Sequence, residues 1–152
     1  MKLIVTLLSL VLATSVFARE YCERPAEIEA DSAVPLLGRY EIIGRLPDSD
    51  KSYGGYLEIM AGKTAYVLRR TVGGKVSRGE GWMEVCSADR FSVFRFRYPN
   101  ASPASPTAPA LQGQCYFRGN GDNYLLMSCY TTWLGQETHR RGLESMFQLE
   151  AP

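Results

Sequence analysis

The sequence predicts an all-β fold, a single antiparallel meander of about eight strands closed into a small barrel. From Leu37 onward, short aromatic and β-branched runs alternate with glycine-containing turns, which is typical of strands joined by hairpins. Several turns are tight, so consecutive strands should pair antiparallel. A meander of this length removes its exposed edges by closing into a barrel, and a two-sheet β-sandwich is the alternative. The sequence has neither a βαβ rhythm nor a Gly-x-Gly-x-x-Gly loop, which disfavours a nucleotide-binding fold.

Residues 1–18 have the pattern of a secretory signal peptide. A short positive start is followed by the apolar run 3–12 and by a small-residue exit with Val16 and Ala18 at positions −3 and −1. The run is shorter than the roughly 20 residues of a membrane-spanning helix, so no membrane span is expected. Cleavage after Ala18 would release a mature chain into the periplasm or the medium.

The mature chain divides into an N-terminal segment, residues 19–36, and a β-barrel domain, residues 37–152. Residues 26–30 could form one short helical turn between Pro25 and Pro35. The predicted strands are Gly38–Leu46, Tyr53–Met60, Thr64–Val72, Lys75–Cys86, Arg90–Tyr98, Gln112–Arg118, Tyr124–Leu134 and Gly142–Leu149. The loop 99–111 holds four of the eight prolines and is expected to be extended and solvated.

Alternation along the strands predicts which side chains face the interior. In the fifth predicted strand the aromatic residues Phe94, Phe96 and Tyr98 should point inward, and Arg95 and Arg97 outward. In the third, neither face of the stretch 64–70 is cleanly apolar. The two glycines on either side of Glu80 predict a bend or bulge in the fourth strand.

The chain has four cysteines, Cys22, Cys86, Cys115 and Cys129. An even number in an exported domain indicates two disulfides, with three possible pairings. A hairpin turn within the glycine- and asparagine-rich residues 119–123 would place Cys115 directly opposite Cys129, within disulfide reach. The remaining pair, Cys22–Cys86, would then attach the N-terminal segment to the sheet.

The sequence offers no arrangement of catalytic or metal-binding residues. The single histidine, His139, lies in a polar run without an evident orienting partner or nucleophile, and an exposed loop position is expected. With Glu137 it could supply at most two metal ligands. Glu80 and Glu84 share a strand face, but about 13 Å between their α-carbons is too far for paired-carboxylate chemistry. We therefore expect a non-catalytic protein with no cofactor and no metal.

The charge of the mature chain is balanced, with 16 basic and 16 acidic residues. A neutral domain has no strong attraction for nucleic acid or anionic lipid, so neither is expected as a partner. Residues 19–60 carry an excess of four acids, and residues 61–152 an excess of four bases. The two parts could attract each other within one fold, or the second could present an arginine-rich face to an acidic partner.

Aromatic residues and arginines supply the candidate binding residues. Tyrosine combines apolar area with a hydroxyl and arginine is favoured at interfaces, although the tyrosines could equally fill a small barrel. Tyr53 and Tyr56 flank a glycine pair, and Arg95 and Arg97 lie on one outward strand face. These four residues are the predicted binding site.

The stretch Gly38-Arg39-Tyr40 opens the first strand where lipocalins and avidins have Gly-x-Trp, and glycine-punctuated hairpins follow. In this architecture the chain resembles the lipocalin and avidin group of meander barrels. In size, export signal and paired cysteines it is also similar to periplasmic inhibitors of lysozymes and to immunity proteins against secreted toxins. Residues 52–56 are reminiscent of the Ser-Gly-x-Tyr loop of these inhibitors.

Together, these features predict an exported protein that binds a protein partner, for example as an enzyme inhibitor or a toxin-immunity protein. The alternative is a carrier of a small apolar ligand inside the barrel. A carrier needs small inward side chains and a cavity, so an interior filled by Phe94, Phe96, Trp82 and Trp133 would argue against it.

Overall fold

The structure is a computed structural model that describes residues 22–24, 36–86, 91–100, 109–119 and 124–150. The expected signal peptide, the helical turn at 26–30 and most of the proline-rich loop lie outside the described residues. None of the described residues belongs to a helix long and apolar enough to cross a membrane.

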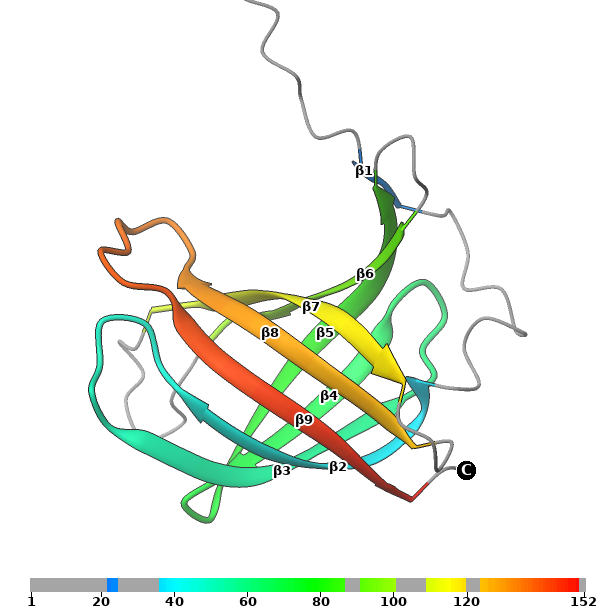
Figure 1. Cartoon of the computed structure of the whole chain (residues 1–152), viewed down its shortest axis with the longest axis horizontal. Coiled ribbons are helices and arrows are strands. Elements are labelled where there is room, and N and C mark those ends of the chain that lie inside the picture. The colour runs from blue at the N-terminus through cyan, green and yellow to red at the C-terminus, as the bar shows by residue number, and fades with distance from the viewer. Residues whose placement is uncertain (1–21, 25–35, 87–90, 101–108, 120–123, 151–152) are drawn as a thin grey trace, which may run out of the picture.

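The fold is a closed barrel of eight antiparallel strands, as the sequence predicts, and not a sandwich (Figure 1). The barrel strands are β2 (Gly38–Arg45), β3 (Ser52–Met60), β4 (Tyr66–Val72), β5 (Lys75–Cys86), β6 (Phe91–Tyr98), β7 (Leu111–Gly119), β8 (Leu125–Trp133) and β9 (Gly142–Glu150). Each strand pairs with the next along the chain, and β9 pairs with β2 to close the ring. The strand boundaries differ from the predicted ones by at most two residues.

A ninth strand, β1 (Cys22–Glu23), lies outside the ring. It pairs with the last two residues of β5, where Cys22 stands opposite Cys86 and forms a disulfide with it. Figure 1 shows β1 beside this end of β5, away from the body of the barrel. The N-terminal segment is thus attached to the sheet at the predicted place.

The second disulfide, Cys115–Cys129, also forms as predicted, between directly opposed residues of β7 and β8. Both cysteines are buried and belong to the cluster of apolar side chains that fills the interior. The described disulfides are consistent with an oxidising location.

Aromatic rings fill the barrel interior over positions that lack a side chain. Phe94, Phe96 and Tyr98 are buried and point inward, as predicted. A Cβ atom added at Gly79 would lie 2.5 Å from the Tyr98 ring, and one added at Gly81 would lie 2.5 Å from the Phe94 ring. Because an interior is closely packed, these glycines make room for the rings.

Of the bend or bulge predicted at these glycines, the bulge is wrong. The pairing of β5 with β4 runs through Gly79 and Gly81, and its pairing with β6 through Gly81, without a shift in register. Among the described ladders, a shift lies instead between Arg39 and Tyr40, where β2 meets β9. The glycines in β5 therefore make room for the rings; they do not mark an extra, unpaired residue in the strand.

Candidate functional site

A row of directly opposed residues crosses the outside of five neighbouring strands. Trp82 on β5 stands opposite Arg95, which stands opposite Gln114, and the row continues through Tyr130 to Leu143 on β9. Neighbouring strands lie about 4.8 Å apart, so the row is roughly 19 Å long. It presents aromatic, cationic, amide and aliphatic groups on one surface.

The row forms much of the floor of an open groove of about 410 Å³. Besides the first four members of the row, the groove is lined by residues that include Glu84, Gln112, Tyr116 and Arg141. Its size is within the range of ligand sites, and its lining mixes rings with hydrogen-bonding groups. The groove is therefore suited to binding a ligand that is partly polar.

Glu84 is fixed by its neighbours and organises one end of the groove. One carboxylate oxygen accepts a hydrogen bond of 2.7 Å from the Trp82 indole, and the other accepts one of 3.0 Å from Arg95 Nε. The ion pair with Arg95 is partly buried. Because the pair uses Nε, the two terminal guanidinium nitrogens of Arg95 lie outside it and can donate to a ligand.

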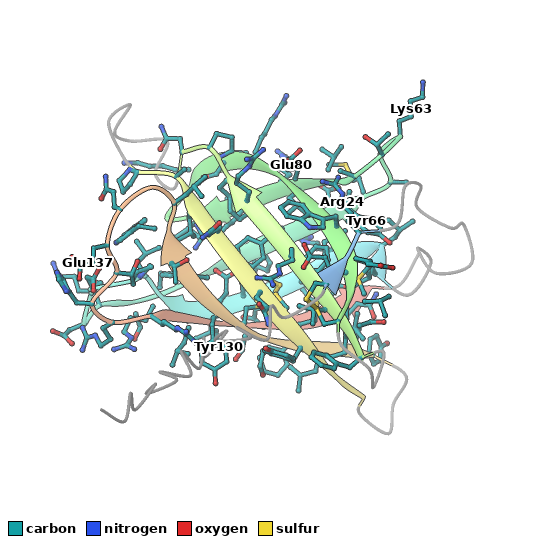
Figure 2. The ribbon with its side chains drawn as sticks, turned by 90° about the horizontal axis from the view of Figure 1, so that it is seen from above. Arg24, Lys63, Tyr66, Glu80, Tyr130 and Glu137 are labelled. Carbon is teal, nitrogen blue, oxygen red and sulfur yellow. A yellow bond between two sulfur atoms is a disulfide. The ribbon has the colours of Figure 1, made fainter. Side chains whose placement is uncertain are left out.

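From the end of the row, exposed apolar side chains extend over β7, β8, β9 and β2. Tyr116, Tyr130, Leu143, Phe147 and Ile43 are each between 38% and 54% exposed. Tyr130 stands directly opposite Leu143, and Ile43 stands opposite Ser145, which lies between Leu143 and Phe147 on the outer side of β9. We call the five exposed apolar residues the apolar face. Figure 2 shows Tyr130 pointing away from the barrel.

The structure separates the four predicted binding residues. Tyr53 and Tyr56 point to opposite sides of β3, because they are three positions apart and side chains alternate. Tyr53 points inward and donates a hydrogen bond to Glu144. Tyr56 is exposed and lies under the guanidinium of Arg39, at 4.6 Å. The two tyrosines therefore form no common surface.

The two predicted arginines do point outward, and each has an acidic partner. Arg95 pairs with Glu84 and lies in the groove. Arg97 pairs with Glu80 at 2.6 Å, in an exposed ion pair on the next row. Figure 2 shows Glu80 on the outside of the barrel. Of the predicted residues, Arg95 is the one that lines the groove.

A buried ion pair lies inside the barrel. Arg70 on β4 donates a hydrogen bond of 3.1 Å to Glu144 on β9, and both side chains are almost fully enclosed. The Arg70 guanidinium lies 4.7 Å from the Tyr53 ring and 5.7 Å from the Tyr98 ring. This pair explains why the sequence of β4 shows no clean face: Tyr66 and Leu68 share the inner face with an arginine.

Burial and charge determine the titration of this cluster. Burial raises the pKa of Tyr53 and of Tyr98 well above the ordinary value, and the negative charge of Glu144 raises both further. For Arg70, burial is the largest influence and lowers the pKa, but Glu144 together with Tyr53 and Tyr98 outweighs it, so the pKa is raised. The tyrosines therefore stay neutral and the arginine charged in the folded protein.

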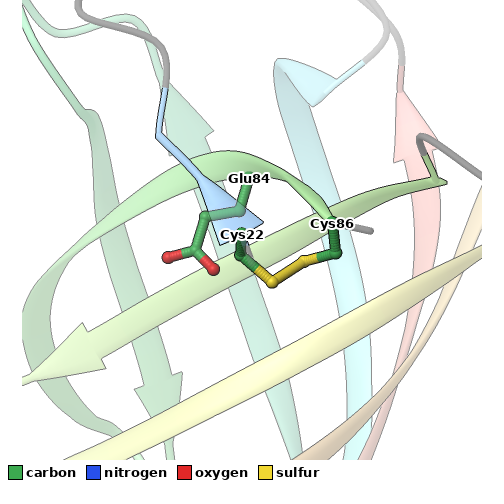
Figure 3. A group of neighbouring side chains, drawn as sticks. All are labelled: Cys22, Glu84 and Cys86. Carbon is green, nitrogen blue, oxygen red and sulfur yellow. A yellow bond between two sulfur atoms is a disulfide. The ribbon is translucent and has the colours of Figure 1, made fainter. Parts of the chain in front are cut away.

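No metal site follows from the acid and cysteine side chains that lie together. Cys22, Cys86 and Glu84 have ligand atoms within 4.8 Å of one another. Figure 3 shows that the two sulfur atoms are bonded to each other beside the Glu84 carboxylate, so the thiolates that a metal needs are not available. His139 is exposed and lies 3.8 Å from Glu137, as expected of a loop histidine.

Sequence reasoning missed most of the groove. Trp82, considered above only as a side chain that could fill the interior, lies outside, on the same face as Glu84 and Arg95. The pairing of Cys115 with Cys129 contained a usable signal, because it also places Gln114 opposite Tyr130. The meeting of β5 with β6, which adds Trp82 and Arg95 to the row, is set by the barrel itself.

No protein-family model matches this chain, and no curated protein or solved structure does either. The architecture is compatible with the calycin-like barrels that the sequence resembles. The assignment of a function therefore depends on the chain's own surface.

Proposed function

We propose that this protein is an exported, non-catalytic binding protein that recognises a protein partner through the groove and the apolar face. The observation that carries the proposal is that five exposed apolar side chains, two of which line the polar groove, lie on neighbouring strands on one side of the barrel. Soluble monomers rarely expose large contiguous apolar patches, and those that they do expose often bind other proteins. Tyrosine, tryptophan and arginine, which the groove supplies, dominate the binding energy of such interfaces.

The described interior favours a protein partner over a small apolar ligand inside the barrel. Phe94 and Phe96 fill the centre, and the Phe96 ring lies over Gly113, where an added Cβ would meet it at 2.2 Å. The buried Arg70–Glu144 pair occupies further interior space with charge. A hydrocarbon ligand would have to displace packed rings and desolvate this pair.

Export and inhibition belong to the same proposal. The signal-like N-terminus and two disulfides fit a protein that works in an oxidising compartment. The similarity to lysozyme inhibitors and immunity proteins supports a partner that is itself an exported enzyme or toxin. The lipocalin-like resemblance is one of architecture, which does not imply the lipocalin function.

The test is affinity purification of the tagged, exported protein from its native extract, with mass spectrometry of both proteins and small molecules. The variant Tyr130→Ala/Leu143→Ala removes the centre of the proposed surface. The matched control, Val67→Ala/Val76→Ala, removes apolar side chains of similar exposure from the outside of β4 and β5. We expect a stoichiometric protein with the wild type and the control, and at least tenfold less with the first variant.

Three results would contradict the proposal. Equal capture by all three proteins would show that another surface binds. A co-purifying lipid without a protein would identify a carrier. Self-association in sedimentation, abolished by Tyr130→Ala/Leu143→Ala, would show that the face is covered by a second copy.

A further inference from the structure

We infer that the groove takes an acidic, extended segment of the partner protein. This inference rests on the proposed function and adds the chemistry of the segment that is bound. Two arginines and one glutamate line the groove, Arg95, Arg141 and Glu84, and a third arginine, Arg24, lies over the Trp82 ring at its edge. The basic groups exceed the acidic ones by two, although the mature chain as a whole is neutral.

Arg141 contributes a charge that the described residues do not balance. It is exposed, it lines the groove, and no ion pair to its side chain is found in the part of the chain that the structure describes. Its neighbour Arg140, by contrast, pairs with Asp50 at 2.8 Å. A partner carboxylate is the group that would complete Arg141, because a guanidinium can bind it through two parallel hydrogen bonds.

Arg24 adds a second such charge from a different part of the chain. Its guanidinium lies over the Trp82 ring, 4.8 Å from the ring centre, and donates a hydrogen bond of 3.2 Å to the Thr64 carbonyl. The Cys22–Cys86 disulfide holds the preceding residues against β5. The disulfide therefore has a role beyond stability: it places a cation at the edge of the groove.

The glutamines favour a polypeptide over other polyanions. The amide nitrogen of Gln112 donates a hydrogen bond of 3.2 Å to the Thr132 hydroxyl, and that of Gln114 donates one to the Tyr116 hydroxyl. Both side chains thus present carbonyl oxygens, which accept hydrogen bonds. A polypeptide offers backbone N–H donors to these oxygens together with carboxylates for the arginines, whereas phosphate groups offer acceptors only.

The test uses a displayed library of random 12-residue peptides, selected on the exported wild-type protein and titrated by fluorescence anisotropy. We expect enrichment of aspartate and glutamate among the selected peptides and weaker binding at higher salt. Arg24→Gln/Arg141→Gln should weaken binding about tenfold or more, because it removes two charge-assisted contacts at exposed positions. The control Arg39→Gln removes an exposed arginine on β2, across the ring from β6, and should bind like the wild type.

The inference is overturned if selection yields no peptides, if the selected peptides are not acidic, or if Arg24→Gln/Arg141→Gln binds them like the wild type. Stronger binding of a single-stranded oligonucleotide than of the peptides, with the same dependence on both arginines, would identify a general polyanion site instead. The capture experiment with Tyr130→Ala/Leu143→Ala is read separately. If the variant loses its partner and the peptide result is negative, the proposed function stands and the acidic segment does not.

Discussion

At the residue scale, interior glycines tolerate substitution as poorly as large core side chains do. An added Cβ at Gly79 would lie 2.4 Å from the Arg97 carbonyl oxygen as well as 2.5 Å from the Tyr98 ring. Because one of these contacts is backbone, a side-chain rotation cannot relieve it. We expect Gly79→Ala to lower the free energy of unfolding by about 1–3 kcal/mol, as overpacked cores do.

The control for this prediction is Gly54→Ala on the outside of β3. Its added Cβ would have one neighbour, the Ile42 carbonyl oxygen at 3.9 Å. We expect a change within about 0.5 kcal/mol, measured for both variants by urea unfolding. Equal effects of the two substitutions would show that the rings do not depend on the missing side chain.

The buried ion pair gives a second prediction at this scale. Arg70→Met leaves Glu144 buried without its cation, so unfolding should require about 3–5 kcal/mol less free energy. The double variant Arg70→Met/Glu144→Leu removes both charges and should be more stable than the sum of the single effects implies. A urea double-mutant cycle measures this coupling, and additive single effects would contradict it.

The sequence could not have predicted this pair from local pattern. Arg70 and Glu144 are 74 residues apart, and each is a charged residue at a position that alternation assigns to the interior. Charged residues are rarely buried unless paired, and the partner becomes visible only when the ring closes. The outward direction of Arg95 was predictable, because it alternates with two buried phenylalanines on its own strand.

At the element scale, the two disulfides have different consequences. β1 contributes two paired residues and lies outside the ring. We expect Cys22→Ala/Cys86→Ala to leave the barrel folded, while the Glu23 amide of β1 loses its protection from hydrogen exchange. The same variant should weaken binding of the selected acidic peptides, because Arg24 is no longer held at the groove.

The comparison is Cys115→Ala/Cys129→Ala, which removes a cross-link between buried residues of β7 and β8. The Cys115–Cys129 disulfide links residues that are 14 positions apart in the sequence, and a cross-link of this span is expected to contribute about 3 kcal/mol to stability. This variant should lower the free energy of unfolding without altering hydrogen exchange in β1. If the Glu23 amide lost its protection from hydrogen exchange in this variant, the two disulfides would not have separate roles.

Most of the elements could be predicted because local signals agree with the fold. Lys75–Cys86 was predicted without error, since Gly73 and Gly74 both adopt positive φ in the turn that precedes it. The bulge at Gly79 and Gly81 was the error, because a glycine in a strand has the same sequence signal whether it permits a bulge or a ring. That choice depends on Tyr98 and Phe94, which lie on another strand.

At the scale of the whole molecule, buried tyrosines predict a loss of stability in alkali. Burial raises the pKa of Tyr40, Tyr53 and Tyr98 far above the value of about 10 in an unfolded chain. Above pH 10 the unfolded state therefore loses protons that the folded state keeps, and the free energy of unfolding falls as pH rises. Three such groups give a slope of up to about 4 kcal/mol per pH unit.

Urea unfolding between pH 8 and about 11.5 measures this slope, and ultraviolet absorbance of tyrosinate reports ionisation. We expect stability to be insensitive to these groups below pH 10, and the three tyrosines to ionise only as the barrel unfolds. Ionisation of all the tyrosines near pH 10 in the folded protein would contradict the buried positions of these three.

In the proposed complex, a protein partner covers the side of the barrel that carries the groove and the apolar face. Hydroxyl-radical footprinting of the captured complex, read by mass spectrometry, tests it most directly. We expect Tyr116, Tyr130 and Phe147 to lose reactivity on binding, while Met60 and Val67, across the ring on β3 and β4, keep theirs. Unchanged reactivity of the first three residues, or protection confined to Met60 and Val67, would contradict the account.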